Sequence, residues 1–286
     1  MDRFEGKVAV ITGAGSGFGR EFARKGAALG MKLVLADLDT AGLAATVEAV
    51  RAAGGDAIGV TTDVSDAVQV QALAQASLDE YGGVHMLFNN AGVGAGGFVW
   101  ENSANDWQWV FGVNVMGVAN GLRAFVPVML AQNEPAHIVN TASVAGLLAA
   151  PAMGVYNASK HAVVALTETL HHDLRLAGAS RIGVSLLCPA FVPTGIADAE
   201  RSRPGTLAND APYTASQKLA ARRLTRAVEG GKLSARDIAE LTFDAVREGR
   251  FYVVTHPNIM PSVQLRLDDI AQLRNPTDPM SLKHPR

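Results

Sequence analysis

The sequence has little cysteine, no long apolar run and no excess of charge of either sign. Its single cysteine, Cys188, lies in an apolar run, so we expect a buried thiol rather than a disulfide or a metal ligand. An isolated thiol fits a reducing compartment, and we expect the cytoplasm. No stretch reaches the roughly 18 apolar residues of a membrane-spanning helix, and the N-terminus lacks the pattern of a signal peptide.

The net charge of −2 comes without a basic block, which argues against nucleic acid or an anionic membrane as the main partner. The 286 residues are 48% hydrophobic and 18% charged, so the chain can bury a large core. We expect one domain that extends over residues 1–286.

Short apolar runs alternate with helix-like segments along the chain. The expected strands are residues 7–12, 32–36, 57–61, 85–88, 136–141, 182–188 and 251–255. The expected helices are residues 18–29, 40–53, 65–81, 105–130, 154–177, 234–248 and 263–273. This alternation predicts an α/β fold with a doubly wound, seven-stranded, mostly parallel sheet of the Rossmann type and helices on both faces. Ligands of such sheets bind beyond the carboxyl ends of the strands.

A glycine turn joins the first expected strand to the first expected helix. Its spacing is Gly13-x-x-x-Gly17-x-Gly19. Glycines let the backbone turn sharply and approach a pyrophosphate, which the free N–H groups of the following helix can bind. An ordinary flexible loop is the alternative, but the position between a buried strand and a helix favours nucleotide binding.

Asp37 closes the second expected strand, 20 residues after Gly17. An acid at this place can accept hydrogen bonds from the adenosine ribose and would repel a 2′-phosphate. Ser16 and Leu38 bring no positive charge for such a phosphate, so we expect NAD as the cofactor rather than NADP. The alternative is that Asp37 is a solvated turn residue.

Tyr156 and Lys160 are four residues apart in an expected helix, so they lie on one face of it. A lysine ammonium beside a tyrosine lowers the pKa of the phenol and makes it a better proton donor or acceptor at neutral pH. Ser143 precedes the pair by thirteen residues, at the end of another expected strand. The alternative is an amphipathic surface tyrosine with a solvated lysine.

Taken together, these motifs resemble the short-chain dehydrogenase/reductase family, in that family's order and spacing, from residue 7 to about residue 195. The matching residues are Thr12–Gly19, Asp63-Val64, Asn89–Gly92, Asn114, Ser143, Tyr156-x-x-x-Lys160 and Pro189-x-x-Val192-x-Thr194. One departure is Ala190, where the family usually has glycine. The resemblance implies that the cofactor is bound by Gly13, Ser16, Gly17, Phe18, Asp37, Leu38, Asp63, Val64, Asn90, Tyr156, Lys160, Val192 and Thr194.

The resemblance also implies a catalytic set of Asn114, Ser143, Tyr156 and Lys160. Ser143 would position the substrate oxygen and Tyr156 would transfer the proton. Lys160 would lower the pKa of Tyr156 and orient the nicotinamide ribose. Asn114 would distort its helix and hold a water that links Lys160 to solvent. No metal is needed for this chemistry.

The segment of residues 191–232 is expected to be a lid over the substrate pocket, ordering when ligand binds. The expected substrate residues are Ser143, Ala145, Met153, Tyr156 and Phe191, with Val93, Gly94 and Leu147 as further walls. These walls are mostly apolar, so we expect a bulky, apolar secondary alcohol or ketone. Four arginines of the lid could bind an anionic tail of the substrate, although a solvated helix face is the favoured interpretation of Arg201, Arg203, Arg222 and Arg223.

Residues 257–286 form a C-terminal extension. Its last part, residues 276–286, contains three prolines, and we expect it to be mobile unless a subunit binds it. The long helices expected at 105–130 and 154–177 cannot bury every apolar face on one sheet. The family commonly pairs these helices, so we expect a homo-oligomer, a tetramer or dimer. Trp100, Trp107 and Trp109 are expected to serve packing or this interface.

The function expected from these residues is an NAD-dependent oxidoreductase that interconverts a secondary alcohol and a ketone. The alternative is an NAD(H)-binding sensor or scaffold without catalysis, and a third option is an isomerase or dehydratase that uses bound NAD internally. The presence of Asn114, Ser143, Tyr156 and Lys160 together favours the oxidoreductase, because a scaffold does not need all four.

Overall fold

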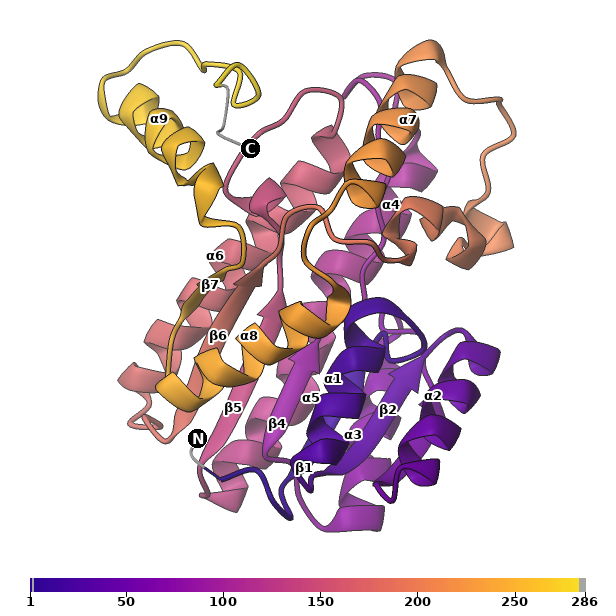
Figure 1. The fold of residues 1–286 in the computed structure, drawn as a ribbon, viewed down its shortest axis with the longest axis vertical. Helices are drawn as coiled ribbons and strands as arrows, with labels where there is room; N and C mark the ends of the chain where they lie inside the picture. Colours follow the sequence, from indigo (N-terminus) through magenta and orange to yellow (C-terminus); the bar gives the residue numbers. More distant parts are fainter. Residues whose placement is uncertain (2, 283–286) are drawn as a thin grey trace.

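In the computed structural model, which describes residues 1 and 3–282, parallel strands form one sheet in the order β3-β2-β1-β4-β5-β6-β7 (Figure 1). The strands are β1 (Val8–Thr12), β2 (Lys32–Asp37), β3 (Asp56–Thr61), β4 (Met86–Asn89), β5 (Ala136–Thr141), β6 (Ile182–Cys188) and β7 (Tyr252–Val254). Every neighbouring pair in this sheet is parallel. The predicted fold class is therefore confirmed, and the strand order reverses between β1 and β4, where ligands of such sheets bind.

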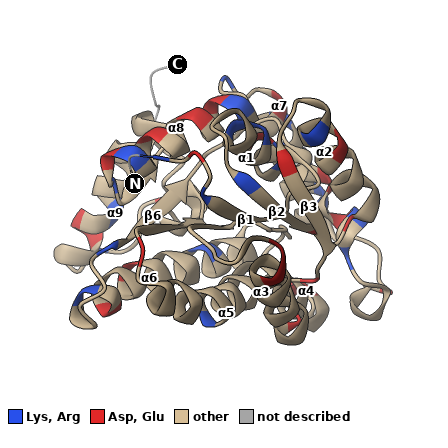
Figure 2. Cartoon of the chain, turned by 90° about the horizontal axis from the view of Figure 1, so that it is seen from below, with Lys and Arg blue, Asp and Glu red and all other residues tan. Residues whose placement is uncertain are grey.

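Helices cover both faces of the sheet, as Figure 2 shows from below. One face carries α1 (Gly17–Ala28), α2 (Thr40–Ala52) and α8 (Ala235–Glu248), and the other carries α3 (Ala67–Tyr81), α5 (Gly117–Gln132) and α6 (Gly154–Leu176). The first face is filled by a core that includes Phe22, Phe88 and Phe243, and the second by a core that includes Leu87 and Phe125. Because the sheet is buried on both faces, its strands are continuous apolar runs and do not alternate between apolar and polar residues.

The helix expected at residues 105–130 is interrupted. It consists of α4 (Ala104–Phe111), a π-helical turn η1 (Gly112–Met116) and α5. The N–H of Gly117 donates to the carbonyl of Gly112, a bond one residue longer than in an α-helix. The whole stretch Ala104–Gln132 has the length and composition of a membrane-spanning helix. In this structure some of its apolar side chains, Phe125 among them, pack into the core on the sheet, whereas Met116 is exposed.

Above the carboxyl ends of the strands lie the lid and the C-terminal extension. The lid contains η3 (Gly195–Ser202), η4 (Gly205–Leu207) and α7 (Ala215–Glu229), and the extension contains η5 (Pro257–Ile259) and α9 (Met260–Ala271). The sequence favours a solvated helix face at Arg222 and Arg223 but does not delimit the helix α7. A signal was present, because Thr214 and Gln217 form a capping box at its start.

The C-terminal segment is held against α9 by hydrogen bonds within the chain. The buried carboxylate of Asp269 accepts from the N–H of Thr277 (2.9 Å) and from Nε of Arg274 (3.0 Å). The hydroxyl of Ser262 donates to the carbonyl of Pro279 (2.9 Å). These bonds hold Thr277 and Pro279 against α9, and the mobility of the segment stays a prediction. Residues 283–286 lie outside the described part.

Candidate active site

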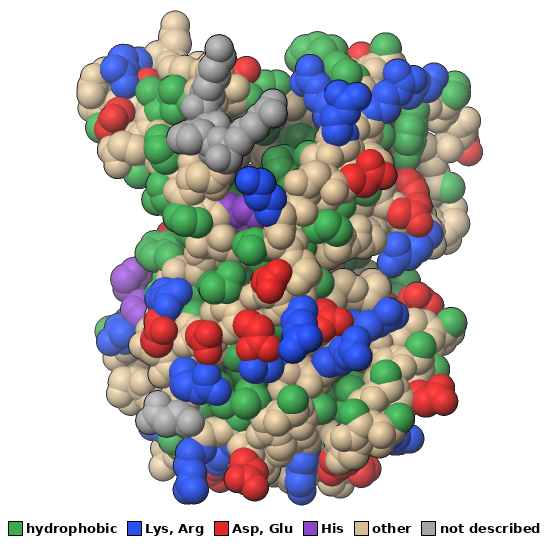
Figure 3. Space-filling model, in the orientation of Figure 1, with side chains coloured by type: hydrophobic (Ala, Val, Ile, Leu, Met, Phe, Trp, Pro, Cys, Tyr) green, Lys and Arg blue, Asp and Glu red, His purple; other side chains and the backbone are tan. Residues whose placement is uncertain are grey.

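The carboxyl ends of the strands open into one cavity of about 1500 Å³. It extends from the glycine turn to the C-terminal segment, and Figure 3 shows this face of the molecule hollowed between the α9 side and the α7 side. The strand ends supply its polar side chains, such as Asp37 at the end of β2, Asn90 after β4 and Ser143 after β5. The parallel sheet thus brings together residues that are distant in the sequence.

The glycines of the first turn are required mainly by close packing within the protein. A Cβ on Gly13 would lie 2.9 Å from Cα of Ala91, and one on Gly19 would lie 2.1 Å from the carbonyl oxygen of Gly13. Gly17 has φ of +52°, a conformation that favours glycine. Ser16, at the start of α1, makes no side-chain capping bond among the described residues, so the helix presents N–H groups to the cavity. The turn therefore fits a pyrophosphate group.

Asp37 is oriented by the same turn. One of its carboxylate oxygens accepts from the N–H of Gly15 (2.7 Å), and the other accepts from the N–H of Asp39 (2.9 Å). The other cofactor residues expected from the sequence line the same cavity, and the full set is Gly13, Ser16, Gly17, Phe18, Asp37, Leu38, Asp63, Val64, Asn90, Tyr156, Lys160, Val192 and Thr194. The residues present thus fit a nicotinamide dinucleotide, the group implied by this fold.

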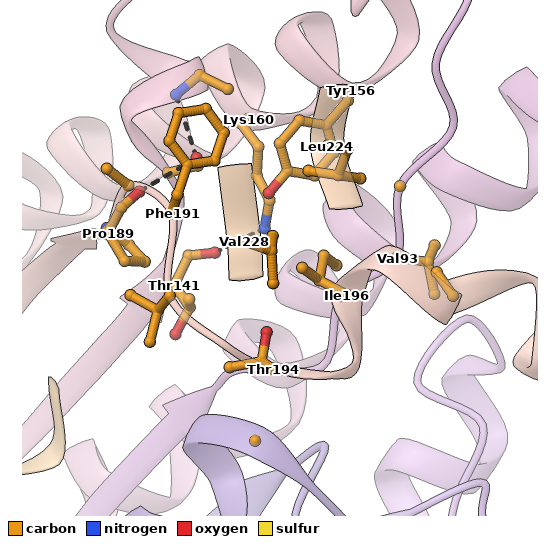
Figure 4. Close-up of a pocket in the computed structure, with 18 of the residues that line it drawn as sticks. Val93, Thr141, Tyr156, Lys160, Pro189, Phe191, Thr194, Ile196, Leu224 and Val228 are labelled. Atoms are coloured by element: carbon orange, nitrogen blue, oxygen red, sulfur yellow. Dashed lines mark hydrogen bonds between the residues drawn. The ribbon is translucent and has the colours of Figure 1, made fainter. Parts of the chain in front are cut away.

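Tyr156 and Lys160 point into the cavity from α6, as Figure 4 shows. Nζ of Lys160 donates to the carbonyl of Thr141 (2.9 Å) and lies 5.7 Å from the ring centroid of Tyr156. Ser143 lies beside them, where its hydroxyl donates to the carbonyl of Pro189 (3.3 Å) and accepts from the N–H of Ala145 (3.1 Å). Burial lowers the pKa of Lys160 to about 8.

The pKa of Tyr156 differs from the expectation. Burial raises it above its ordinary value, while the neighbouring Ser143 hydroxyl acts in the opposite direction. Lys160 was expected to lower this pKa, but in this structure its ammonium is bound to the Thr141 carbonyl and removal from water has the larger effect. The phenol is therefore held in its protonated form, which suits the donation of a proton to a carbonyl oxygen.

Asn114 lies in the π-helical turn, behind the cavity wall. Its amide is paired with the main chain of Val93, accepting from the N–H and donating to the C=O, both at 2.9 Å. It also donates to the hydroxyl of Ser159 (3.0 Å). A Cβ on Gly92 would meet both the Asn114 oxygen (3.4 Å) and Nζ of Lys160 (3.5 Å). The structure thus makes Asn114 a positioning residue for the loop beside Lys160, and its link to a water stays a prediction.

The substrate side of the cavity has apolar walls. The predicted residues Ala145, Met153 and Phe191 line it, whereas Leu147 does not, because it packs against a separate core cluster that includes Val163 and Leu186. The sequence analysis missed several walls, which come from α7 and the C-terminal extension, namely Ala220, Leu224, Val228, Ile259 and Met280 (Figure 4 for Leu224 and Val228). The i, i+4 spacing of the α7 residues was the signal that could have revealed them.

Two of the lid arginines have environments that the sequence did not indicate. Arg203 is buried: it stacks on Trp109 (4.1 Å to the ring centroid) and pairs with Asp106 (2.7 Å) and Glu200 (2.7 Å). Its favoured interpretation as part of a solvated face is wrong, because it connects the lid to α4. Arg201 approaches Ser16 (3.4 Å), so the lid brings to this place a positive charge that neither Ser16 nor Leu38 supplies.

These features define a Rossmann-type dehydrogenase that uses a nicotinamide cofactor. A family model described as short chain dehydrogenase matches residues 7–205. The chain belongs to the short-chain dehydrogenase/reductase family, which confirms the resemblance inferred from the motifs.

Known relatives cover nearly the whole chain. A short-chain dehydrogenase/reductase from Burkholderia phymatum, solved in complex with NAD, is 70% identical, with a TM-score of 0.97 over 99% of this chain and 100% of that chain. The CLA biosynthesis dehydrogenase/reductase of Lactiplantibacillus plantarum is 34% identical over 94% of this chain and 95% of its own length. The 1-deoxy-11-beta-hydroxypentalenate dehydrogenase of Streptomyces exfoliatus is 32% identical over 92% of this chain and 88% of its own length.

Proposed function

We propose that this protein is an NAD-dependent oxidoreductase that interconverts a bulky, apolar secondary alcohol and the corresponding ketone. The observation that carries the proposal is the position of Tyr156, Ser143 and Lys160. All three line the cavity between its polar, cofactor side and its apolar walls, with the Ser143 hydroxyl next to the phenol of Tyr156. A substrate oxygen at this junction would lie within reach of both hydroxyls while its hydrocarbon part rests on the apolar side.

The chain's own residues would manage the proton while the bound nicotinamide cofactor supplies hydride exchange. In the reductive direction the Tyr156 hydroxyl donates its proton to the substrate oxygen and becomes a phenolate, and in the oxidative direction this phenolate accepts the proton of the substrate hydroxyl. The Ser143 hydroxyl donates a hydrogen bond to the same oxygen. Lys160 holds a positive charge beside the phenol, which stabilises the phenolate that forms after donation.

NAD is proposed over NADP because Asp37 places a carboxylate at the end of β2. A 2′-phosphate next to this carboxylate would be repelled. The relative from Burkholderia phymatum, solved with NAD, supports the proposal. Dissociation constants for NADH and NADPH test it, and equal or tighter binding of NADPH would contradict the role of Asp37.

The apolar character of the substrate is supported by the walls that α7 and the C-terminal extension add, among them Leu224 and Met280. One relative is named as the dehydrogenase of a hydroxypentalenate, which supports a hydroxylated substrate. We expect the preferred compound to be a secondary alcohol whose apolar part fills the space under α7.

The test is a panel of secondary alcohols and ketones, from small to long-chain and polycyclic, read by NADH absorbance. Turnover should rise with apolar size. Tyr156→Phe should lose about 10³-fold in kcat while its Kd for NADH stays within twofold, because only the transferable proton is removed. Absence of turnover on the whole panel, with NADH binding intact, would support the alternative of a non-catalytic sensor. Full activity of Tyr156→Phe would contradict the mechanism.

Two further parts of the proposal concern the setting of the enzyme. A cytoplasmic location is supported by the single, buried Cys188, and fractionation of the source cell tests it. A homo-oligomer is supported by apolar side chains left partly exposed in the π-helical turn, such as Val115 and Met116. Light scattering that gives a monomer mass at micromolar concentration would contradict it.

A further inference from the structure

The lid places one arginine over the start of α1. Arg201, in η3, donates from Nη2 towards the hydroxyl of Ser16 (3.4 Å) and from Nη1 to the carbonyl of Gly195 (3.3 Å). A Cβ on Gly195 would lie 2.7 Å from Nη1, so the guanidinium approaches the backbone of Gly195 closely only because this residue has no side chain. Arg201 and Ser16 are 185 residues apart in the sequence, and both line the cavity.

The charge of this guanidinium is poorly balanced. Among residues 1 and 3–282, the acid within ion-pair distance is Asp198, at 3.9 Å and largely exposed, so this pair contributes little. The start of α1 carries the positive end of the helix dipole and has no acidic residue in its first turn. Two positive features therefore face each other across Ser16. Such an arrangement is favourable only when an anion lies between them.

We infer that Arg201 binds the diphosphate of the nicotinamide dinucleotide and thereby couples cofactor binding to closure of the lid. The inference rests on the cofactor part of the proposed function and is independent of the substrate. Planar guanidinium groups bind phosphate oxygens in a bidentate manner, which gives both strength and orientation. The contact to Ser16 is long enough to be exchanged for one to a phosphate oxygen.

The diphosphate is favoured over a 2′-phosphate by what surrounds Arg201. Its own segment packs on the glycine turn, where a Cβ on Gly17 would lie 3.4 Å from Cβ of Thr194. The adenosine end of the cavity is marked by the Asp37 carboxylate, which repels a further phosphate. A cation that lies over the start of α1 therefore meets the phosphates that the helix itself attracts.

The coupling to the lid follows from the neighbouring arginine. Arg203, two residues further on, is fixed to α4 through Asp106 and Trp109. The lid segment is thus fixed to α4 on one side and can be fixed to the cofactor through Arg201 on the other. Cofactor binding would order the segment between Thr194 and Arg203 before the substrate site is complete.

The experiment compares Arg201→Gln and Arg201→Lys with the control Arg222→Gln, which removes an exposed lid arginine that lies outside the cavity. Calorimetry measures Kd for NADH, NADPH, ADP-ribose and adenosine. Arg201→Gln should weaken NADH and ADP-ribose about tenfold and leave adenosine unchanged, because adenosine has no phosphate. Arg201→Lys should bind NADH and ADP-ribose more tightly than Arg201→Gln but less tightly than the wild type. Arg222→Gln should match the wild type.

Hydrogen exchange gives a second readout that does not depend on activity. NADH should protect the amides of residues 195–203 in the wild type and in Arg222→Gln, and this protection should be lost in Arg201→Gln. A Kd for NADH within twofold of the wild type would overturn the inference. Equal weakening of adenosine, or a larger loss for NADPH than for NADH, would overturn it as well, since it would indicate a structural effect or a 2′-phosphate contact. A protein without turnover on any substrate would still give these binding results.

Discussion

The two sides of the cavity are held in different ways. On the sheet side, site residues follow directly after strands and are held by nearby main chain, as when Asn90 donates to the carbonyl of Thr12 (2.9 Å). On the lid side, a few side-chain pairs join segments far apart in the sequence. Arg203 with Asp106 and Ser216 with Glu101 are two of them.

This difference indicates how the two sides respond to change. The sheet side is determined by many buried contacts at once, so a substitution there affects folding or the chemical step. The lid side depends on single polar pairs, so a substitution there changes how often the lid opens and how well substrate binds. The cofactor site is thereby rigid, while the substrate site can vary with little effect on the core.

The largest contrast is expected from two glycine substitutions. Gly19→Ala places a Cβ 2.1 Å from the Gly13 carbonyl, in packed backbone, and should lower the free energy of unfolding by more than about 3 kcal/mol. In the lid, a Cβ on Gly205 would have no atom within 4 Å, so Gly205→Ala should change the free energy of unfolding by less than about 0.5 kcal/mol. Urea denaturation measures both, and similar losses would remove the contrast between the two sides.

Arg203→Met should act on the lid alone. The loss of the guanidinium leaves the buried carboxylate of Asp106 without its ion partner, and opening of the lid should become easier by about 2 kcal/mol. We expect faster tryptic cleavage in the lid and a KM for substrate about tenfold higher, with little change in the thermal midpoint of the core. Arg222→Met is the matched control. A large drop in the thermal midpoint would show that the lid folds together with the sheet.

A pH experiment sharpens the sheet side of the comparison. The pKa of Lys160 is lowered to about 8 by burial, from 10.5. Between these values the unfolded chain binds more protons than the folded one, so stability should rise with pH. Relative to Lys160→Met, the wild type should gain on the order of 2 kcal/mol between pH 7.5 and pH 10. Parallel stability curves for the two proteins would contradict the lowered pKa.

The smallest effect is expected at the C-terminal extension. Asp269→Asn removes the charge that accepts hydrogen bonds from Arg274 and Thr277 while it keeps the side-chain shape. Tryptic cleavage after Arg274 should become several times faster, and KM should rise about threefold because Met280 no longer stays at the cavity wall. Asp268→Asn, a substitution at the neighbouring, more exposed residue, is the control and should leave both quantities unchanged.

The sheet side could be predicted from the sequence because its signals are local. Each strand is a short apolar run, and Asp37, Asn90 and Ser143 follow such runs directly. The lid side could not be predicted in the same way. Arg203 and Asp106 are 97 residues apart, and no local pattern tells that their side chains meet. The helix α7 could be predicted in part. Its capping box is a local pattern in the sequence, but its apolar face can be assigned to the cavity only once the tertiary structure is known.

The sequence by itself determined the succession of strands and helices along the chain, the position of the glycine turn and the identity of the residues at the strand ends. Periodicity and residue type act over a few neighbours, so they can be read along the chain. The tertiary structure decided which charges are buried, and with them the pKa of Tyr156, the connection of Arg203 to α4 and the place of Arg201 over α1. Burial and ion pairing depend on segments that meet only after folding, because the electrostatic environment of a group is set by everything packed around it.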